Sequence, residues 1–421
     1  MEILIRSARI IDTGSPFHNQ VKDILVANGK IKKIGTKLSN TSKAKEIKAD
    51  NLHVSLGWFD LNTFLADPGY EQKETIESGC KAAAFGGFTH ICCMPNTYPV
   101  TQTKSQIEYV LRKASDEIVS VHPLGAVTLN TDGTDLTEMY DMHTAGAIAF
   151  SDGLRSSPNA GMVERALLYA KAFDGVIMNH SEEKSISKNG TMHEGVVSLK
   201  LGLPAAPALA EEISVSRDLY ILEYTQSKLH LLDISLKRSV DLIRSAKKKN
   251  LKLSSSVNAY NLWLDENAIG DYDTNYKVNP HLRTKEDIAA LIKGIQDGTI
   301  DTITSAHQPQ DEECKKLEFD KAEFGMIGLE TCFAIANTAL KDKVELTKII
   351  EAIANNPRII LGLNNTIKEG AIADLTLFNP KMKWTFTESD IQSKSKNTPF
   401  VGTEFVGKAI GIINKDKLQL N

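Results

Sequence analysis

The chain has 421 residues, of which 42% are hydrophobic and 24% are charged, and its formal net charge is -4. This composition is ordinary for a globular protein, and the length suits one large α/β barrel with a small second domain. The acidic balance argues against nucleic-acid binding, which needs a basic surface. No apolar stretch approaches the ~20 residues of a membrane span. The five cysteines form no C-x-x-C pair, so we expect reduced thiols and a cytoplasmic protein.

Both ends of the chain carry the period-two alternation that is typical of β-strands. The first six residues mix charged with apolar side chains and predict a strand rather than a signal peptide. Further alternation follows around Ile24 and Val26, with a turn at Asn28-Gly29. Residues 373–380 and 406–413 have the same character. We therefore predict one small β-sandwich domain that is formed by residues 1–52 and 366–421 together.

The middle of the chain, residues 53–365, predicts a TIM-type (β/α)8 barrel. Eight short apolar runs recur there, each followed by a polar cluster and usually by a helical pattern, such as the one over 239–249. Short apolar strands that alternate with helices indicate a parallel sheet covered on both faces. Eight such units are typical of a barrel whose chemistry lies at the C-terminal ends of its strands. The predicted runs lie near residues 54–59, 89–94, 119–127, 147–152, 175–180, 228–234, 251–257 and 300–306.

Polar residues at these strand ends are the candidates for function. They are Asp60, Asn62, Asn96, Asp152, His180, His230, Asp233, Asn258 and His307, and Ala306 occupies one further strand end.

Several motifs, in order along nearly the whole chain, resemble those of bacterial dihydroorotases of the amidohydrolase superfamily. They include Asp67-Pro68-Gly69, Met94-Pro95-Asn96-Thr97, Phe150-Ser151-Asp152, Asn279-Pro280-His281-Leu282-Arg283 and Asn397-Thr398-Pro399-Phe400. The resemblance implies a barrel with a β-sandwich built from both termini. Enzymes of this family open or close the dihydroorotate ring with one or two zinc ions. The chemistry needs a metal-activated hydroxide and a carboxylate that shuttles the proton.

The resemblance fails at the positions that would hold the metal. The family's His-x-His on the first strand reads Asn62 and Phe64 here, and phenylalanine has no atom that can coordinate zinc. A later family histidine is Asp233. The aspartate that both binds metal and acts as acid and base is replaced by Ala306. We therefore expect no catalytic residue of the family's type.

Two ligand positions of the family survive, Asp152 and His180. They either form an ordinary hydrogen-bonded pair or, with Asp233 as a third ligand, a mononuclear zinc site of low occupancy. Two ligands alone rarely hold zinc where three or four are usual.

The substrate-binding positions are also altered. The arginine that grips the substrate carboxylate in the family is replaced by Ala66, and Gln310 replaces an assisting histidine. Loss of a guanidinium removes strong charge-assisted hydrogen bonds. Asn96 and Asn279 are retained as candidate substrate contacts.

These features lead to three hypotheses for function. The first is an inactive dihydroorotase-like protein that acts as a scaffold or regulatory partner, for example of aspartate carbamoyltransferase, or that assembles with itself. The second is an active cyclic amidohydrolase with an atypical metal site at Asp152, His180 and Asp233. The third is a small-molecule binding module without turnover, supported by Asn96, Asn279 and Arg283.

Overall fold

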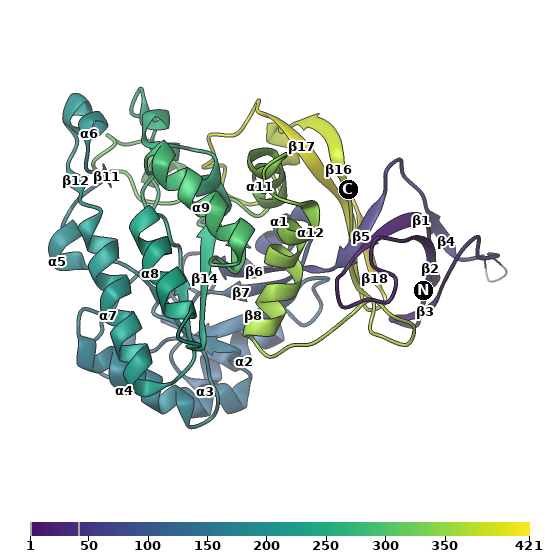
Figure 1. Cartoon of the computed structure of the whole chain (residues 1–421), viewed down its shortest axis with the longest axis horizontal. Coiled ribbons are helices and arrows are strands. Elements are labelled where there is room, and N and C mark those ends of the chain that lie inside the picture. The colour runs from purple at the N-terminus through teal and green to yellow at the C-terminus, as the bar shows by residue number, and fades with distance from the viewer. Residues whose placement is uncertain (1, 41–42) are drawn as a thin grey trace.

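The computed structural model describes residues 2–40 and 43–421, and residues 1 and 41–42 of the predicted N-terminal β segment lie outside the described residues. Eight parallel strands form the barrel and pair in the order β15-β14-β13-β10-β9-β8-β7-β6. A parallel bridge between Thr63 and His307 connects the last strand to the first. The predicted barrel is thus confirmed (Figure 1). Its strands are β6 (Trp58–Thr63), β7 (Phe88–Cys93), β8 (Ser120–Gly125), β9 (Ala149–Phe150), β10 (Ile177–His180), β13 (Leu229–Leu232), β14 (Leu253–Asn258) and β15 (Thr302–Thr304).

Helices cover the outside of the barrel, and local sequence explains where they begin and end. At α1, Thr75 and Ser78 form a capping box, and Gly87 ends the helix at a φ of 95°. In α8 the apolar residues Val240 and Ile243, three apart, are buried against the strands. The longer helices are α1 (Ile76–Gly86), α2 (Lys104–Lys113), α3 (Met139–Ala145), α4 (Ala160–Lys171), α7 (Leu209–Thr225), α8 (Lys237–Lys247), α9 (Lys285–Asp297) and α11 (Cys332–Leu340). The shorter ones are α5 (Lys184–Ser187), α6 (Val196–Leu201), α10 (Glu312–Lys315), α12 (Leu346–Ile350) and α13 (Asn356–Ile360).

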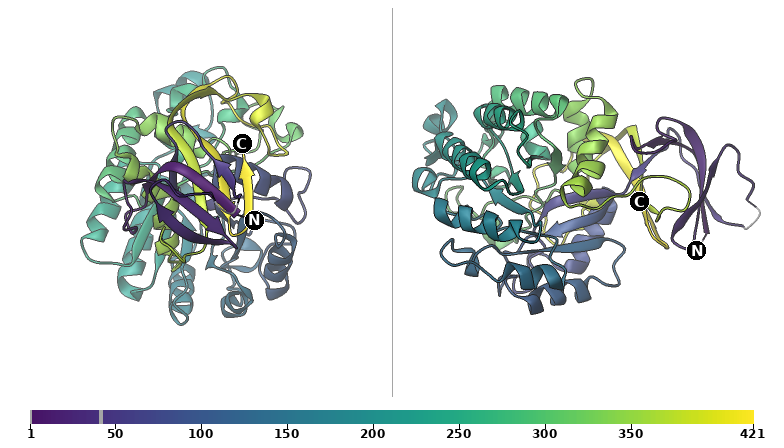
Figure 2. Two further views of the ribbon diagram at one scale, coloured as in Figure 1. Left: turned by 90° about the vertical axis from the view of Figure 1, so that its right-hand side faces the viewer. Right: turned by 60° about the horizontal axis from the view of Figure 1, so that its bottom comes forward.

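Strands from both ends of the chain form a second, mixed sheet, which we call the terminal sheet. Its order is β18-β17-β16-β5-β1-β2-β3, and β4 pairs with β1. Figure 2 shows this sheet set against one side of the barrel. The strands are β1 (Glu2–Ile11), β2 (Val21–Ala27), β3 (Lys30–Gly35), β4 (Lys45–Ile47), β5 (His53–Leu56), β16 (Asp374–Thr385), β17 (Glu404–Asn414) and β18 (Lys417–Leu420). A two-residue pairing of β11 (Met192–His193) with β12 (Ala205–Ala206) completes the strands.

The chain passes from the terminal sheet into the barrel at Gly57. The run that we predicted as the first barrel strand, 54–59, is divided there, because β5 pairs with β1 and β16, and β6 begins only at Trp58. A Cβ on Gly57 would lie 1.9 Å from Thr89 Oγ1 and 2.0 Å from Asp374 Oδ1. Only glycine allows this close approach of the two sheets.

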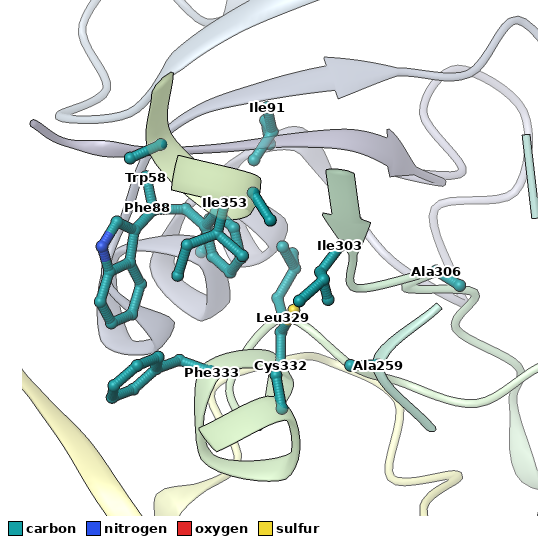
Figure 3. Packing of buried hydrophobic residues seen from close by; sticks show 14 of the residues in the cluster. Trp58, Phe88, Ile91, Ala259, Ile303, Ala306, Leu329, Cys332, Phe333 and Ile353 are labelled. Atoms are coloured by element: carbon teal, nitrogen blue, oxygen red, sulfur yellow. The ribbon is translucent and has the colours of Figure 1, made fainter. Parts of the chain in front are cut away.

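Aromatic side chains pack the junction between the barrel and the terminal sheet. The fully buried Trp58 has its ring centroid 4.5 Å from that of Phe333 on α11 and 5.6 Å from that of Phe378 on β16. Figure 3 shows Trp58, Phe88 and Phe333 gathered in this cluster. Such large rings supply much of the buried apolar area. The barrel and the terminal sheet therefore share one hydrophobic core.

Over residues 2–40 and 43–421, no helix is both long and apolar enough to cross a membrane. All five cysteines are unpaired, and four of them are buried.

Candidate functional site

A run of polar side chains crosses the C-terminal ends of the barrel strands. His180, the last residue of β10, has Nδ1 3.1 Å from Asp233 Oδ2. Asn62 on β6 donates from Nδ2 to the other oxygen of Asp233 at 2.7 Å. On the opposite side of the imidazole, Glu182 Oε2 lies 3.7 Å from His180 Nε2 and accepts a hydrogen bond from Asn279 Nδ2 at 3.1 Å. We call these five residues the central polar chain.

The electrostatics of the central polar chain favour a charged imidazole. Burial alone would lower the pKa of His180, but the hydrogen bond with Asp233 and the charge of Glu182 together raise it to about 9. Burial would raise the pKa of Glu182, yet His180 and Lys184 hold it well below its ordinary value. His180 is therefore an imidazolium between two carboxylates at neutral pH, and both of its ring nitrogens are donors.

Asp152, two residues beyond β9, is held elsewhere, by the turn that follows β8. Its Oδ1 accepts from the backbone N–H groups of Val127 and Thr128 at 2.8 and 2.9 Å, and its Oδ2 accepts from Thr128 Oγ1 at 2.7 Å. Burial raises the pKa of Asp152 to about 6, although these hydrogen bonds act in the opposite direction. The prediction of a hydrogen bond between Asp152 and His180 was wrong. Each residue has other partners, because the loop after β8 supplies Asp152 with donors that sequence position does not show.

The two positions that lost their functional groups carry apolar side chains. Phe64 follows β6 and packs against an apolar cluster inside the barrel that includes Phe59 and Met94. Ala306 follows β15, is 8% exposed and belongs to the main hydrophobic cluster. Figure 3 shows its methyl group beyond Ile303, on the segment that leaves the strand. Neither side chain can bind a metal or move a proton.

Two other carboxylates near these strand ends are fully occupied. Asp60 accepts hydrogen bonds from Ser305 N at 2.8 Å, Ser305 Oγ at 2.6 Å and Thr63 Oγ1 at 2.5 Å. Glu74 lies 3.3 Å from His307 Nε2 and is also hydrogen-bonded by serine hydroxyls. Both carboxylates are completely buried. They stabilise the first and last strands of the barrel against each other and have no access to a substrate.

The donor set does not fit the zinc centre that the fold implies. Zinc needs three or four imidazole, thiolate or carboxylate ligands. Within the two described stretches of the chain, no group of three or more His, Cys, Asp or Glu side chains is placed to hold a metal ion. The structure brings His180 and Asp233 together, whereas Asp152 bonds to the β8 turn.

A cavity of 520 Å³ opens at the same end of the barrel, and we call it the mouth cavity. Phe64 and Ala66 line it where the family would have a metal ligand and an arginine. Lys73 and Arg155 also line it, and neither side chain forms an ion pair with a carboxylate of the described chain. His180, Asp152 and Asp233 are absent from its lining. The mouth cavity is therefore open to a small molecule but is separated from the titratable groups below it.

The three predicted ligand contacts fall in three different places. Asn96 lines the mouth cavity, where its Nδ2 donates to the Asp152 carbonyl at 3.0 Å. Asn279 belongs to the central polar chain instead. Arg283 is 6% exposed and bonds to Ser235 Oγ at 2.9 Å and His193 Nδ1 at 3.0 Å. Arg283 therefore has a structural role, and only Asn96 faces the cavity.

Three residues of this region were missed from the sequence. Glu182 lies two residues beyond the end of β10, so a search that continued past each strand end would have found it. Lys73 and Arg155 lie in loops after β6 and β9. Their convergence on the mouth cavity depends on loop conformation, for which the sequence carries no short-range signal.

Comparisons with known proteins agree with this architecture. A family model described as Dihydro-orotase-like matches residues 53–239. A protein named Dihydroorotase from Geobacter metallireducens is 40% identical over 412 residues, covering 97% of each chain. Another of that name from Syntrophus aciditrophicus is 39% identical over 414 residues, again covering 97% of each.

A solved structure, the L-hydantoinase (dihydropyrimidinase) from Arthrobacter aurescens, has the same fold. Its TM-score is 0.88 at 22% sequence identity, and the match covers 99% of this chain and 95% of that chain. The identity of 40% to the bacterial relatives extends over nearly the full length of both chains. The chain belongs to the dihydroorotase family.

Proposed function

We propose that this dihydroorotase-family protein has lost dihydroorotate turnover and acts in the cytoplasm as a scaffold or regulatory partner in pyrimidine biosynthesis. The single observation that carries the proposal is the side chain at position 306. Ring opening needs a group that takes a proton from water and returns it to the amide nitrogen. A buried methyl group stands at the position from which the family's aspartate would act.

Three carboxylates near the strand ends are not placed to take over this role. Asp60 and Glu74 are buried and saturated with hydrogen bonds, as described above. Asp152 has no place in the lining of the mouth cavity. A substrate in that cavity would meet Phe64 and Ala66 at two of the altered family positions, and neither side chain can carry a proton. General acid–base catalysis requires hydrogen-bond reach between the shuttle and the reacting atoms.

The outer surface of the barrel supports a role in association. Leu199 on α6 is 84% exposed, and Tyr220 and Tyr224 on α7 are 76% and 74% exposed. Figure 1 places α6 and α7 on the side of the barrel away from the terminal sheet. Each of these side chains offers exposed apolar surface, and such surface often marks protein–protein contacts where it gathers. The partner that we propose is aspartate carbamoyltransferase, with self-association as the other arrangement.

Analytical ultracentrifugation tests the proposed association. The full chain is sedimented alone and with the aspartate carbamoyltransferase of the same organism. We expect a mixed or homo-oligomeric species whose dissociation constant rises at least about tenfold in Leu199→Ser/Tyr220→Ser, since central apolar contacts dominate binding energy. Ile359→Ser on α13 is the matched control, because Ile359 is 67% exposed and lies on neither helix. A strictly monomeric chain that does not bind the carbamoyltransferase would contradict the scaffold role.

An active cyclic amidohydrolase with an atypical site is the second candidate. The relatives that are 40% identical carry the name Dihydroorotase, which favours retained activity. Two buried atoms of the central polar chain, the donor His180 Nε2 and the acceptor Asn62 Oδ1, have no hydrogen-bond partner and could each bond to a substrate group. This candidate uses Asp152, His180 and Asp233. It predicts a measurable amide hydrolysis that Asp152→Ala abolishes while the fold remains intact.

A further inference from the structure

A second, larger cavity lies far from the strand ends, where the terminal sheet meets the barrel helices. Its volume is 690 Å³, and we call it the junction cavity. The terminal sheet contributes residues of β1, β5, β16 and β17, and the barrel contributes the end of α11 and α12. Figure 1 shows α11 and α12 on the side of the barrel that faces this sheet. None of its lining residues also lines the mouth cavity.

Basic side chains dominate the polar lining of the junction cavity. Arg9, Lys341 and Lys381 come from three separate segments, and no ion pair within 4 Å joins any of them to a carboxylate of the described chain. A fourth cation, Lys383, contacts Glu404 at 3.7 Å. The only acidic residue in the lining is Asp342. Four cations against one acid is a local excess in a chain whose formal net charge is -4.

The pKa of the buried His53 is affected by two of these cations, Arg9 and Lys381. His53 is 6% exposed, and its Nδ1 lies 2.8 Å from the Asn51 carbonyl oxygen, so Nδ1 carries the proton. Burial lowers the pKa of His53, and the charges of Arg9 and Lys381 lower it further against the effect of that hydrogen bond. A neutral imidazole at the inner wall therefore adds no further positive charge to that of Arg9, Lys341 and Lys381.

Apart from Asn51 and Asn337, the remaining lining is apolar, and we call this part the apolar wall. It consists of Val344, Leu346, Ile349, Pro380 and Val406. Ligand pockets of ~300–1,000 Å³ commonly combine such a wall with a few polar groups. The combination would hold a ligand with an apolar ring and a group of high negative charge.

We propose that the junction cavity binds a phosphorylated small molecule, with its phosphate oxygens between Arg9, Lys341 and Lys381 and its ring on the apolar wall. A phosphate group fits better than one carboxylate, because three cations need more than a single negative charge to balance them. The arginine fork matches phosphate geometry, and lysine supplies additional point charges. The position is separate from the barrel mouth, so the proposal does not depend on whether the family's reaction is retained.

Calorimetric titration of the full chain with two probes tests this proposal. The probes are inorganic pyrophosphate, which offers charge alone, and adenosine diphosphate, which adds a ring, both free of divalent metal and at equal ionic strength. We expect saturable binding of both below about 1 mM. Adenosine diphosphate should bind more tightly than pyrophosphate, because it has a ring that can contact the apolar wall and pyrophosphate has none.

Charge-reversal variants assign the binding to this cavity. Lys341→Glu and Lys381→Glu should each weaken both probes at least about tenfold, since each removes a charge-assisted contact. Both side chains are exposed, so the variants should fold, and an unchanged melting temperature without ligand checks this. Lys33→Glu is the matched control, because Lys33 is exposed on β3 of the same sheet and does not line the cavity.

Three outcomes would overturn the proposal. One is the absence of saturable binding of either probe. Another is equal weakening by Lys33→Glu, which would mean general attraction to a basic surface. The third is binding of a short oligoglutamate in the absence of any response to the two phosphates, which would assign the cavity to an acidic protein segment.

Discussion

Replacement of Asp233 by alanine perturbs the central polar chain at its middle. Asp233 is 3% exposed and receives hydrogen bonds from Asn62 and His180. The substitution leaves an amide donor and a charged imidazole buried without their acceptor. Breaking a buried charge pair by removing one partner costs about 3–5 kcal/mol. We expect the free energy of unfolding of Asp233→Ala to fall by that amount.

The corresponding change in melting temperature follows from chain length. An unfolding entropy of about 2.1 cal/mol/K per residue gives about 0.9 kcal/mol/K for 421 residues. A loss of 3–5 kcal/mol therefore lowers the melting temperature by about 3–6 °C. Asp233→Asn keeps the shape and one oxygen acceptor, so its loss should be smaller.

Thermal and urea unfolding of Asp233→Ala, with and without a chelator, measure this effect. Asp416→Ala is the control, because Asp416 is an exposed carboxylate without an ion pair in the described chain. The account requires the same loss whether or not zinc is present. Two results would refute the view that Asp233 stabilises the hydrogen-bonded central polar chain rather than binding a metal. They are a variant as stable as the wild type, and a loss of stability that appears only with zinc.

Three further predictions concern the junction, the histidines and metal content. Asp374→Ala should lower the free energy of unfolding by about 3–5 kcal/mol in urea titrations, because Arg358, 4% exposed, would lose its buried partner. Arg358 and His90 hold the pKa of the Asp374 carboxyl low against the effect of burial, so this carboxylate stabilises the fold. Its contribution is fully present above the ordinary aspartate pKa and should be lost as the pH falls through the lowered pKa of the folded state. The His122 ring should show no NMR titration between pH 5 and 8, because burial and the neighbouring His90 lower its pKa to about 3. Protein equilibrated with zinc and dialysed should retain well below one equivalent by elemental analysis, and tight stoichiometric zinc would contradict the donor set described here.

Much of the fold was predictable because it depends on periodicity. Seven of the eight apolar runs coincide with barrel strands, and the helix predicted over 239–249 is α8, displaced by two residues. The first run was misplaced, since residues 54–56 read as an apolar strand in either sheet. Only Gly57, which fits against Thr89 and Asp374, separates them, and its contact with Asp374 spans more than 300 residues of sequence.

The sequence predicted which functional groups are absent from the site, but not which hydrogen bonds the remaining side chains form. Phe64 and Ala306 lack donor atoms in any conformation, so their effect follows from residue type alone. The partner of Asp233 depends on side-chain geometry across the barrel. A pair of Asp152 and His180 was one of two alternatives for the retained ligand positions, whereas the turn at Thr128 binds Asp152 and leaves Asp233 as the acceptor for His180.

The most direct test of the central claim is dihydroorotate turnover by the purified protein. It is assayed in both directions with excess zinc, beside an active family member at equal concentration. The account predicts no turnover above the uncatalysed rate, because Ala306 provides no proton shuttle. Turnover that persists through purification and disappears in Asp152→Ala would contradict it. That result would mean that the polar groups beneath the mouth cavity form a working catalytic site.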